Sequence, residues 1–93
     1  MKIPKEFRHM ALLMHQDIDL VAPTEEELFP YLAGGLTEDE RATVIHFVEE
    51  LLAADLSGNQ LADIWSDAGA DWILPDKQAP LFFSYLLSEL HKQ

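Results

Sequence analysis

The sequence predicts an all-α fold, a single compact domain of about five helices around one long central helix. Apolar residues recur at the 3.6-residue helical period along most of the chain, and strand-like alternation of useful length is absent. Three segments also begin with Ser or Thr followed three residues later by Glu or Gln, the spacing of a helix-capping box. The length of 93 residues fits one domain that spans residues 1–93.

The predicted central helix covers residues 37–56. Thr37 and Glu40 have capping-box spacing, and the acids at positions 38–40 suit the positive end of a helix dipole. The apolar residues at i, i+3, i+4 and i+7 are Val44, Phe47, Val48 and Leu51. We therefore expect one face of this helix to enter the core and the opposite face to be acidic and exposed.

Two shorter helices are expected before the central one. The first covers residues 5–16, and its apolar face consists of Phe7, Met10, Ala11 and Met14. The second begins at a Thr24–Glu27 capping box. Pro30 should kink this helix or confine it to a turn or two, and the Gly34-Gly35 pair should end it.

Two further helices are expected after the central one. The first begins at a Ser57–Gln60 capping box, and its C′ position is Gly69; its apolar stripe is Leu61, Ile64, Trp65 and Ala68. Residues 70–77 should form a loop pinned by Trp72, Ile73 and Leu74. The closing helix begins near Pro80, and its first turns are apolar nearly all round. We interpret this as deep burial, with contact to a second subunit as the alternative.

The chain is strongly acidic, with 17 acids, six strong bases and a net charge of −11. Fifteen of these acids lie between residues 9 and 76, where Arg41 is the only strong base. Nucleic-acid binding depends on neutralising phosphates with Lys and Arg, so we expect no nucleic-acid partner. A basic protein partner fits the charge, although acidity could also serve only to keep a small protein soluble.

The absence of cysteine excludes disulfides, thiolate metal sites and cysteine nucleophiles, and it suits a reducing cytoplasm. No apolar run approaches the roughly 18 residues that a membrane helix needs. The N-terminal apolar run, residues 10–14, is also too short for a signal peptide. We therefore expect a cytoplasmic protein without a membrane segment.

The segment from His15 to Asp19 comes closest to a chemical site. It alternates an imidazole with the carboxylates of Asp17 and Asp19, and an extended chain would point all three toward one divalent cation. Alternatively, His15 is a half-buried residue at a helix end, and Asp17 accepts hydrogen bonds from turn amides. We favour the second interpretation and expect no metal or other cofactor. Serine-nucleophile motifs are absent, and we expect no enzymatic activity.

A second group of residues indicates protein binding. Asp63, Asp67 and Asp71 follow one another at intervals of four, close in sequence to Trp65 and Trp72. An acidic ridge beside aromatic side chains suits docking on a basic partner. Two core tryptophans with exposed acids would give the same pattern.

Several segments occur in an order that is informative as a set. They are HQD at residues 15–17, ELLAADLS at 50–57, QLADIWSDAGAD at 60–71 and LFFSYLLSEL at 81–90. In this order the chain resembles, over about residues 7–90, one family of small immunity proteins of bacterial contact-dependent growth inhibition systems. The resemblance implies a cytoplasmic binder that neutralises the toxic C-terminal domain of a large secreted effector. Many such toxins are nucleases with basic active sites, which an acidic protein would match.

We expect the partner to contact acids near the loops, namely Asp17, Asp19, Asp67 and Asp71. Trp72 is the expected apolar anchor, because it falls in a loop whereas Trp65 is in phase with a core stripe. The expected state is a monomer, with a homodimer through the closing helix as an alternative. Two other functions stay open: an acidic adaptor or regulator of another basic protein, and a small metal-dependent enzyme at His15, Asp17 and Asp19.

Overall fold

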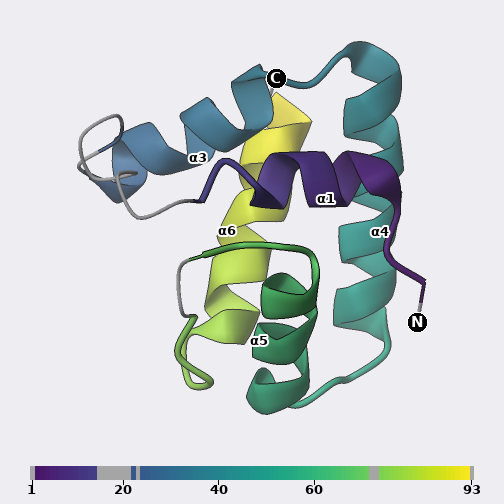
Figure 1. Cartoon of the computed structure of the whole chain (residues 1–93), viewed down its shortest axis with the longest axis vertical. Coiled ribbons are helices and arrows are strands. Elements are labelled where there is room, and N and C mark those ends of the chain that lie inside the picture. Colours follow the sequence, from purple (N-terminus) through teal and green to yellow (C-terminus); the bar gives the residue numbers. More distant parts are fainter. Residues whose placement is uncertain (1, 15–21, 23, 72–73, 93) are drawn as a thin grey trace.

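The computed structural model describes residues 2–14, 22, 24–71 and 74–92. Within these residues the secondary structure is helical and no strand occurs, so the all-α prediction is confirmed (Figure 1). The helices are α1 (Lys5–Ala11), α3 (Glu25–Gly34), α4 (Glu38–Ala53), α5 (Gly58–Asp67) and α6 (Ala79–Lys92). They form one compact globule with a radius of gyration of 12.0 Å. None of the helices in this described part of the chain has the length and apolar character needed to cross a bilayer.

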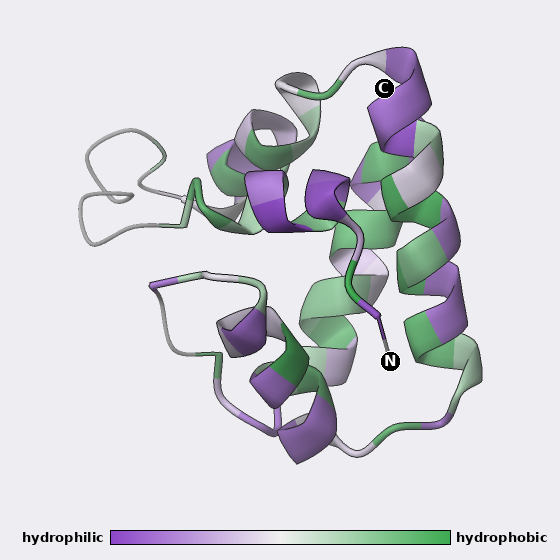
Figure 2. Ribbon diagram, turned by 45° about the vertical axis from the view of Figure 1, so that its right-hand side comes forward, coloured by the Kyte–Doolittle hydropathy of each residue, from purple (hydrophilic) through white to green (hydrophobic). Residues whose placement is uncertain are grey.

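The apolar stripe predicted for the long helix is the buried face of α4. Val44, Val48 and Leu51 are fully buried, and Phe47 is nearly so. Figure 2 shows the same division, with the hydrophobic residues of α4 turned toward the other helices and its hydrophilic residues turned outward. The periodicity alone therefore identified the core side of this helix.

The closing helix α6 shares the central position with α4. It packs against α3, α4 and α5, and it lies between α3 and α4 in Figure 1. Its buried side chains include Phe82, Phe83, Leu86 and Leu90. The predicted burial is thus confirmed for one face, while Leu81 and Tyr85 on the same helix stay exposed.

Helix α1 packs on α4 and α3, and its predicted apolar residues Phe7, Met10 and Ala11 are buried, as is Met14 in the turn that follows. The Phe7 ring lies 4.8 Å from the Phe47 ring and 5.6 Å from the Trp65 ring, so it joins three helices. The helix ends at Ala11, earlier than predicted. The amides of Leu13 and Met14 bond to carbonyls three residues back, which tightens the chain into a turn.

Two of the three predicted capping boxes are complete. Thr37 Oγ1 accepts the Glu40 N–H at 3.2 Å while Glu40 Oε1 accepts the Thr37 N–H at 2.9 Å. Ser57 and Gln60 form the same pair of bonds at the start of α5. Thr24 Oγ1 accepts the Glu27 N–H at 3.3 Å, the first of the two bonds. Each such cap stabilises a helix by about 1 kcal/mol.

Helix α3 differs from the prediction in length and in its C-terminal end. It runs for ten residues through Pro30, so a segment of one or two turns was too short. A proline here removes the bond to the Glu26 carbonyl, but both residues are exposed and water can solvate that carbonyl. The helix ends at the Gly34-Gly35 pair, yet Gly35 has φ −86°, a right-handed conformation open to other residues.

Candidate protein-binding surface

Of the five residues predicted to contact a partner, the structure describes Asp67 and Asp71. Asp67 is the last residue of α5, and Asp71 follows in the segment that leaves this helix; both are exposed. Asp17, Asp19 and Trp72 lie outside the described residues, as do His15 and the rest of the candidate metal segment. The site is therefore built from α5 and the elements that pack around its C-terminal end.

Helix α5 separates an apolar face from an acidic one. Leu61 and Trp65 are buried, whereas Asp63 and Asp67 are exposed. The Trp65 ring packs at 5.1 Å from the Phe82 ring and at 6.0 Å from the Phe83 ring, within the core. Trp65 is thus a core residue, as its phase predicted, and its side chain is not available to a partner.

The C-terminal end of α5 is a Schellman motif. The Gly69 N–H donates to the Ser66 carbonyl at 3.0 Å, and the Ala70 N–H donates to the Trp65 carbonyl at 3.4 Å. Gly69 has φ 111°, a conformation that favours glycine, so its predicted C′ position is confirmed. This turn carries the chain away from the helix toward Asp71.

Helix α1 and the turn after it are hydrogen-bonded to this end of α5. Arg8 Nη1 donates to the Asp67 carbonyl oxygen at 2.8 Å, and the Asp71 N–H donates to the Met14 carbonyl at 2.7 Å. In Figure 1 the chain leaving α5 runs beneath α1. A cation is favoured at the negative end of a helix dipole, so Arg8 stabilises α5 through its backbone.

Three acidic residues line a hollow beside α5. Asp63, Asp71 and Asp76 line a depression of about 330 Å³, and the other lining residues are Ala62, Ser66, Ala70 and Leu74. Asp67 lies one helical turn after Asp63 and is exposed. The three carboxylates, with Asp67 one turn away, can accept hydrogen bonds from Lys or Arg side chains of a partner.

Asp76 was not among the predicted contact residues. It reaches the hollow because the segment before α6 runs against the start of α5. A Cβ placed on Gly58 would overlap the Asp76 carbonyl oxygen and lie 2.8 Å from its carbon. Gly58, directly after the Ser57 cap, was the only local signal of this close approach.

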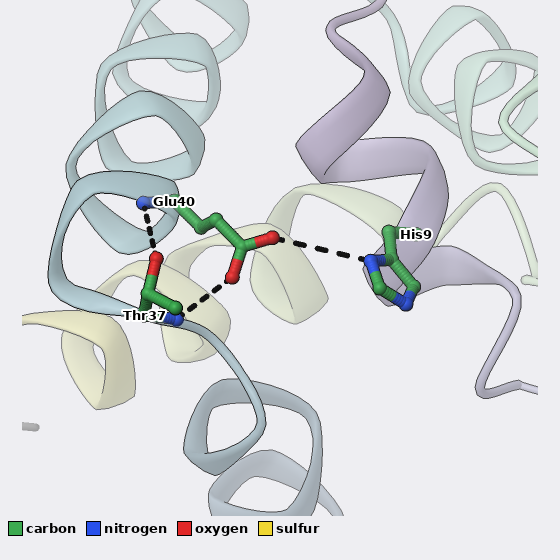
Figure 3. A network of polar contacts seen from close by, with 3 residues as sticks. All are labelled: His9, Thr37 and Glu40. Atoms are coloured by element: carbon green, nitrogen blue, oxygen red, sulfur yellow. Dashed lines mark hydrogen bonds and ion pairs between the residues drawn. The ribbon is translucent and has the colours of Figure 1, made fainter.

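A second polar network links the last turn of α1 to the first turn of α4 (Figure 3). His9 Nδ1 lies 4.0 Å from Glu40 Oε2. The pKa of the Glu40 carboxyl is held below its ordinary value, chiefly by hydrogen bonding with Thr37 and to a lesser degree by the nearby His9 and Lys5. Among the described residues, no group of three His, Cys, Asp or Glu side chains is arranged to hold a metal ion.

Comparisons of this chain with family models, with curated proteins and with solved structures returned no match.

Proposed function

We propose that this chain is an immunity protein that binds the toxic C-terminal domain of a contact-dependent growth inhibition effector. It would act in the cytoplasm by covering the active site or substrate groove of that domain. The observation that carries the proposal is the acidic hollow of Asp63, Asp71 and Asp76 with Asp67 exposed one turn away. The order of sequence segments that resembles such immunity proteins supports the same function.

Charge favours a basic toxin domain, and a nuclease is the class that fits it best. Enzymes that act on nucleic acid carry Lys and Arg along their substrate groove, because phosphates must be neutralised there. Carboxylates that project from α5 and the following segment can occupy the phosphate positions in such a groove. Opposite net charges also speed the encounter of the two proteins.

The test is surface plasmon resonance with the polypeptide encoded beside this chain, at several salt concentrations. Charge reversal in Asp67→Lys/Asp71→Lys should slow association by about tenfold at low salt and flatten the salt dependence. The control is Glu49→Lys/Glu50→Lys, which changes the net charge equally. Both glutamates are exposed on α4, and neither lines the hollow.

The two double variants separate a local contact from a general charge effect. If they slow association equally, net charge governs the encounter and this surface is not the contact. If association ignores salt and both variants bind like the parent, the acidic surface is excluded even though the partner binds. Trp72→Ala should speed dissociation without unfolding the domain, as expected of a central anchor.

An acidic adaptor or regulator is the second candidate function. It is favoured by Leu81 and Tyr85, whose side chains are 54% and 51% exposed. These residues leave an apolar part of α6 open to another chain or to a second copy. Analytical ultracentrifugation distinguishes this case. A stable homodimer that Leu81→Ser dissociates, together with no binding of the neighbouring polypeptide, would favour the adaptor.

A further inference from the structure

We infer that Leu12, beside Asp67 and Asp71, is an apolar anchor of the interface. Its side chain enters a pocket on a basic protein partner. The inference rests on the proposed function, because it names a contact residue of the same surface. Leu12 is 60% exposed, the most exposed large apolar side chain in the part of the chain that the structure describes. A single exposed leucine is common on protein surfaces, so exposure alone does not indicate a binding role. What distinguishes Leu12 is its position.

Its position is fixed by three successive contacts between α1 with its following turn and the end of α5. Arg8 bonds to the Asp67 carbonyl, and Met14 accepts a bond from the Asp71 amide. Between these two bonds Leu12 lies over Gly69, where a Cβ would stand 3.0 Å from Leu12 Cδ2 and 3.7 Å from its Cγ. Leu12 is therefore placed between the two acids that we expect to contact the partner.

Neighbouring residues fix the backbone of Leu12, while its side chain points toward solvent. Met10, Ala11 and Met14 on either side of it are buried, and the Leu12 amide donates to the Arg8 carbonyl at 3.0 Å. Gly69 leaves room for the leucine because it has no side chain. An apolar group that is already positioned loses less conformational freedom on binding, which is what a central anchor requires.

The charges around Leu12 define the partner. On its α5 side the backbones of Asp67 and Asp71 are bonded to Arg8 and Met14, and both acidic residues are exposed. On the α1 side, Leu12 shares a groove with Lys5, Glu6, Arg8, His9 and Glu40, where bases and acids are mixed. Only on the α5 side do the named charges share one sign, which is negative. A fitting partner presents an apolar pocket whose rim is basic where it faces Asp67 and Asp71.

The experiment compares two exposed leucines in surface plasmon resonance with the polypeptide encoded beside this chain. Leu12→Ser should raise the dissociation rate tenfold or more and change the association rate little, because an anchor acts after the encounter. Leu81→Ser, on α6 and 54% exposed, should bind like the parent. Leu12→Met keeps an apolar side chain of similar volume and should retain binding. Circular dichroism of each variant establishes that it is folded.

The outcomes separate this inference from the proposed function. If the parent and Leu12→Ser bind equally, the inference is overturned while the proposed function stands. Loss of binding in Leu81→Ser but not in Leu12→Ser would place the anchor on α6 and also overturn it. No binding by the parent would refute the proposed function and the inference together. If Leu12→Ser is unfolded, Leu12→Ala takes its place, and a folded Leu12→Ala that binds like the parent would overturn the inference.

Discussion

Substitution of Gly69 by alanine tests the geometry that holds the acidic surface. Gly69 has φ 111°, and a Cβ there would press on Leu12. A left-handed conformation costs a residue with a side chain roughly 1–2 kcal/mol. Alanine also restricts the unfolded chain, which returns about 0.4–1 kcal/mol of stability. We therefore expect Gly69→Ala to lower the free energy of unfolding by about 1 kcal/mol.

Gly35→Ala is the matched control, because the chemical change is the same while the backbone conformation at the two positions differs. Gly35 has φ −86°, and nothing lies within 4 Å of a Cβ placed on it. Only the effect on the unfolded chain remains, so the free energy of unfolding of this variant should rise by about 0.4–1 kcal/mol. The two glycine substitutions should thus shift stability in opposite directions, by a difference of roughly 1–2 kcal/mol.

Urea denaturation followed by far-ultraviolet circular dichroism measures both variants. The slope of unfolding free energy against urea should stay at the parent value, so that the shift in midpoint reports stability alone. A thermal melt should place the two variants several degrees apart, since 1 kcal/mol moves the midpoint of such a domain by about 4–8 °C. A Gly69→Ala protein as stable as Gly35→Ala would refute the Schellman geometry and the position assigned to Leu12.

Three further predictions concern the core, the capping box and metal. Val48→Asp should unfold the domain by burying an unpaired charge, whereas Ala42→Asp on the exposed side of α4 should melt near the parent; equal melting would refute the core assignment. The folded pKa of Glu40 lies below its ordinary value of 4.5, so its stabilisation is present above that value and lost as pH falls through the folded pKa. A Glu40→Gln protein should therefore show a weaker loss of stability in acid, and identical pH profiles would contradict this. Metal analysis after dialysis against chelator should find no stoichiometric cation; a retained ion that Asp17→Asn/Asp19→Asn removes would overturn this prediction.

The features that the sequence predicted correctly depend on neighbours within one or two helical turns. The capping bonds of Thr37 and Ser57, the stripe of α4 and the turn at Gly69 all follow from residues three to four positions apart. Pro30 shows the limit of this reasoning. The cost of a proline inside a helix depends on whether water reaches the freed carbonyl, and exposure is a property of the whole fold.

The candidate site was predictable in its charge but not in its assembly. Spacing placed Asp63, Asp67 and Asp71 close together because one helix and its exit segment carry them. Asp76 joins them only through the close approach of its backbone to Gly58, and a single glycine after a helix cap does not indicate which segment approaches it. Such contacts form between elements distant in sequence, and a side-chain period carries no information about them.

The same limit explains why Leu12 carried no signal in the sequence. It follows the buried Ala11 in an apolar run, where it reads as one more core residue. What distinguishes it is the alignment of α1 and its following turn with the end of α5, from Arg8 at Asp67 to Met14 at Asp71. That alignment places an apolar side chain beside two exposed acidic residues, a combination that suits a protein interface. Acids alone attract any basic molecule, whereas an apolar contact between them must be matched in shape before it contributes.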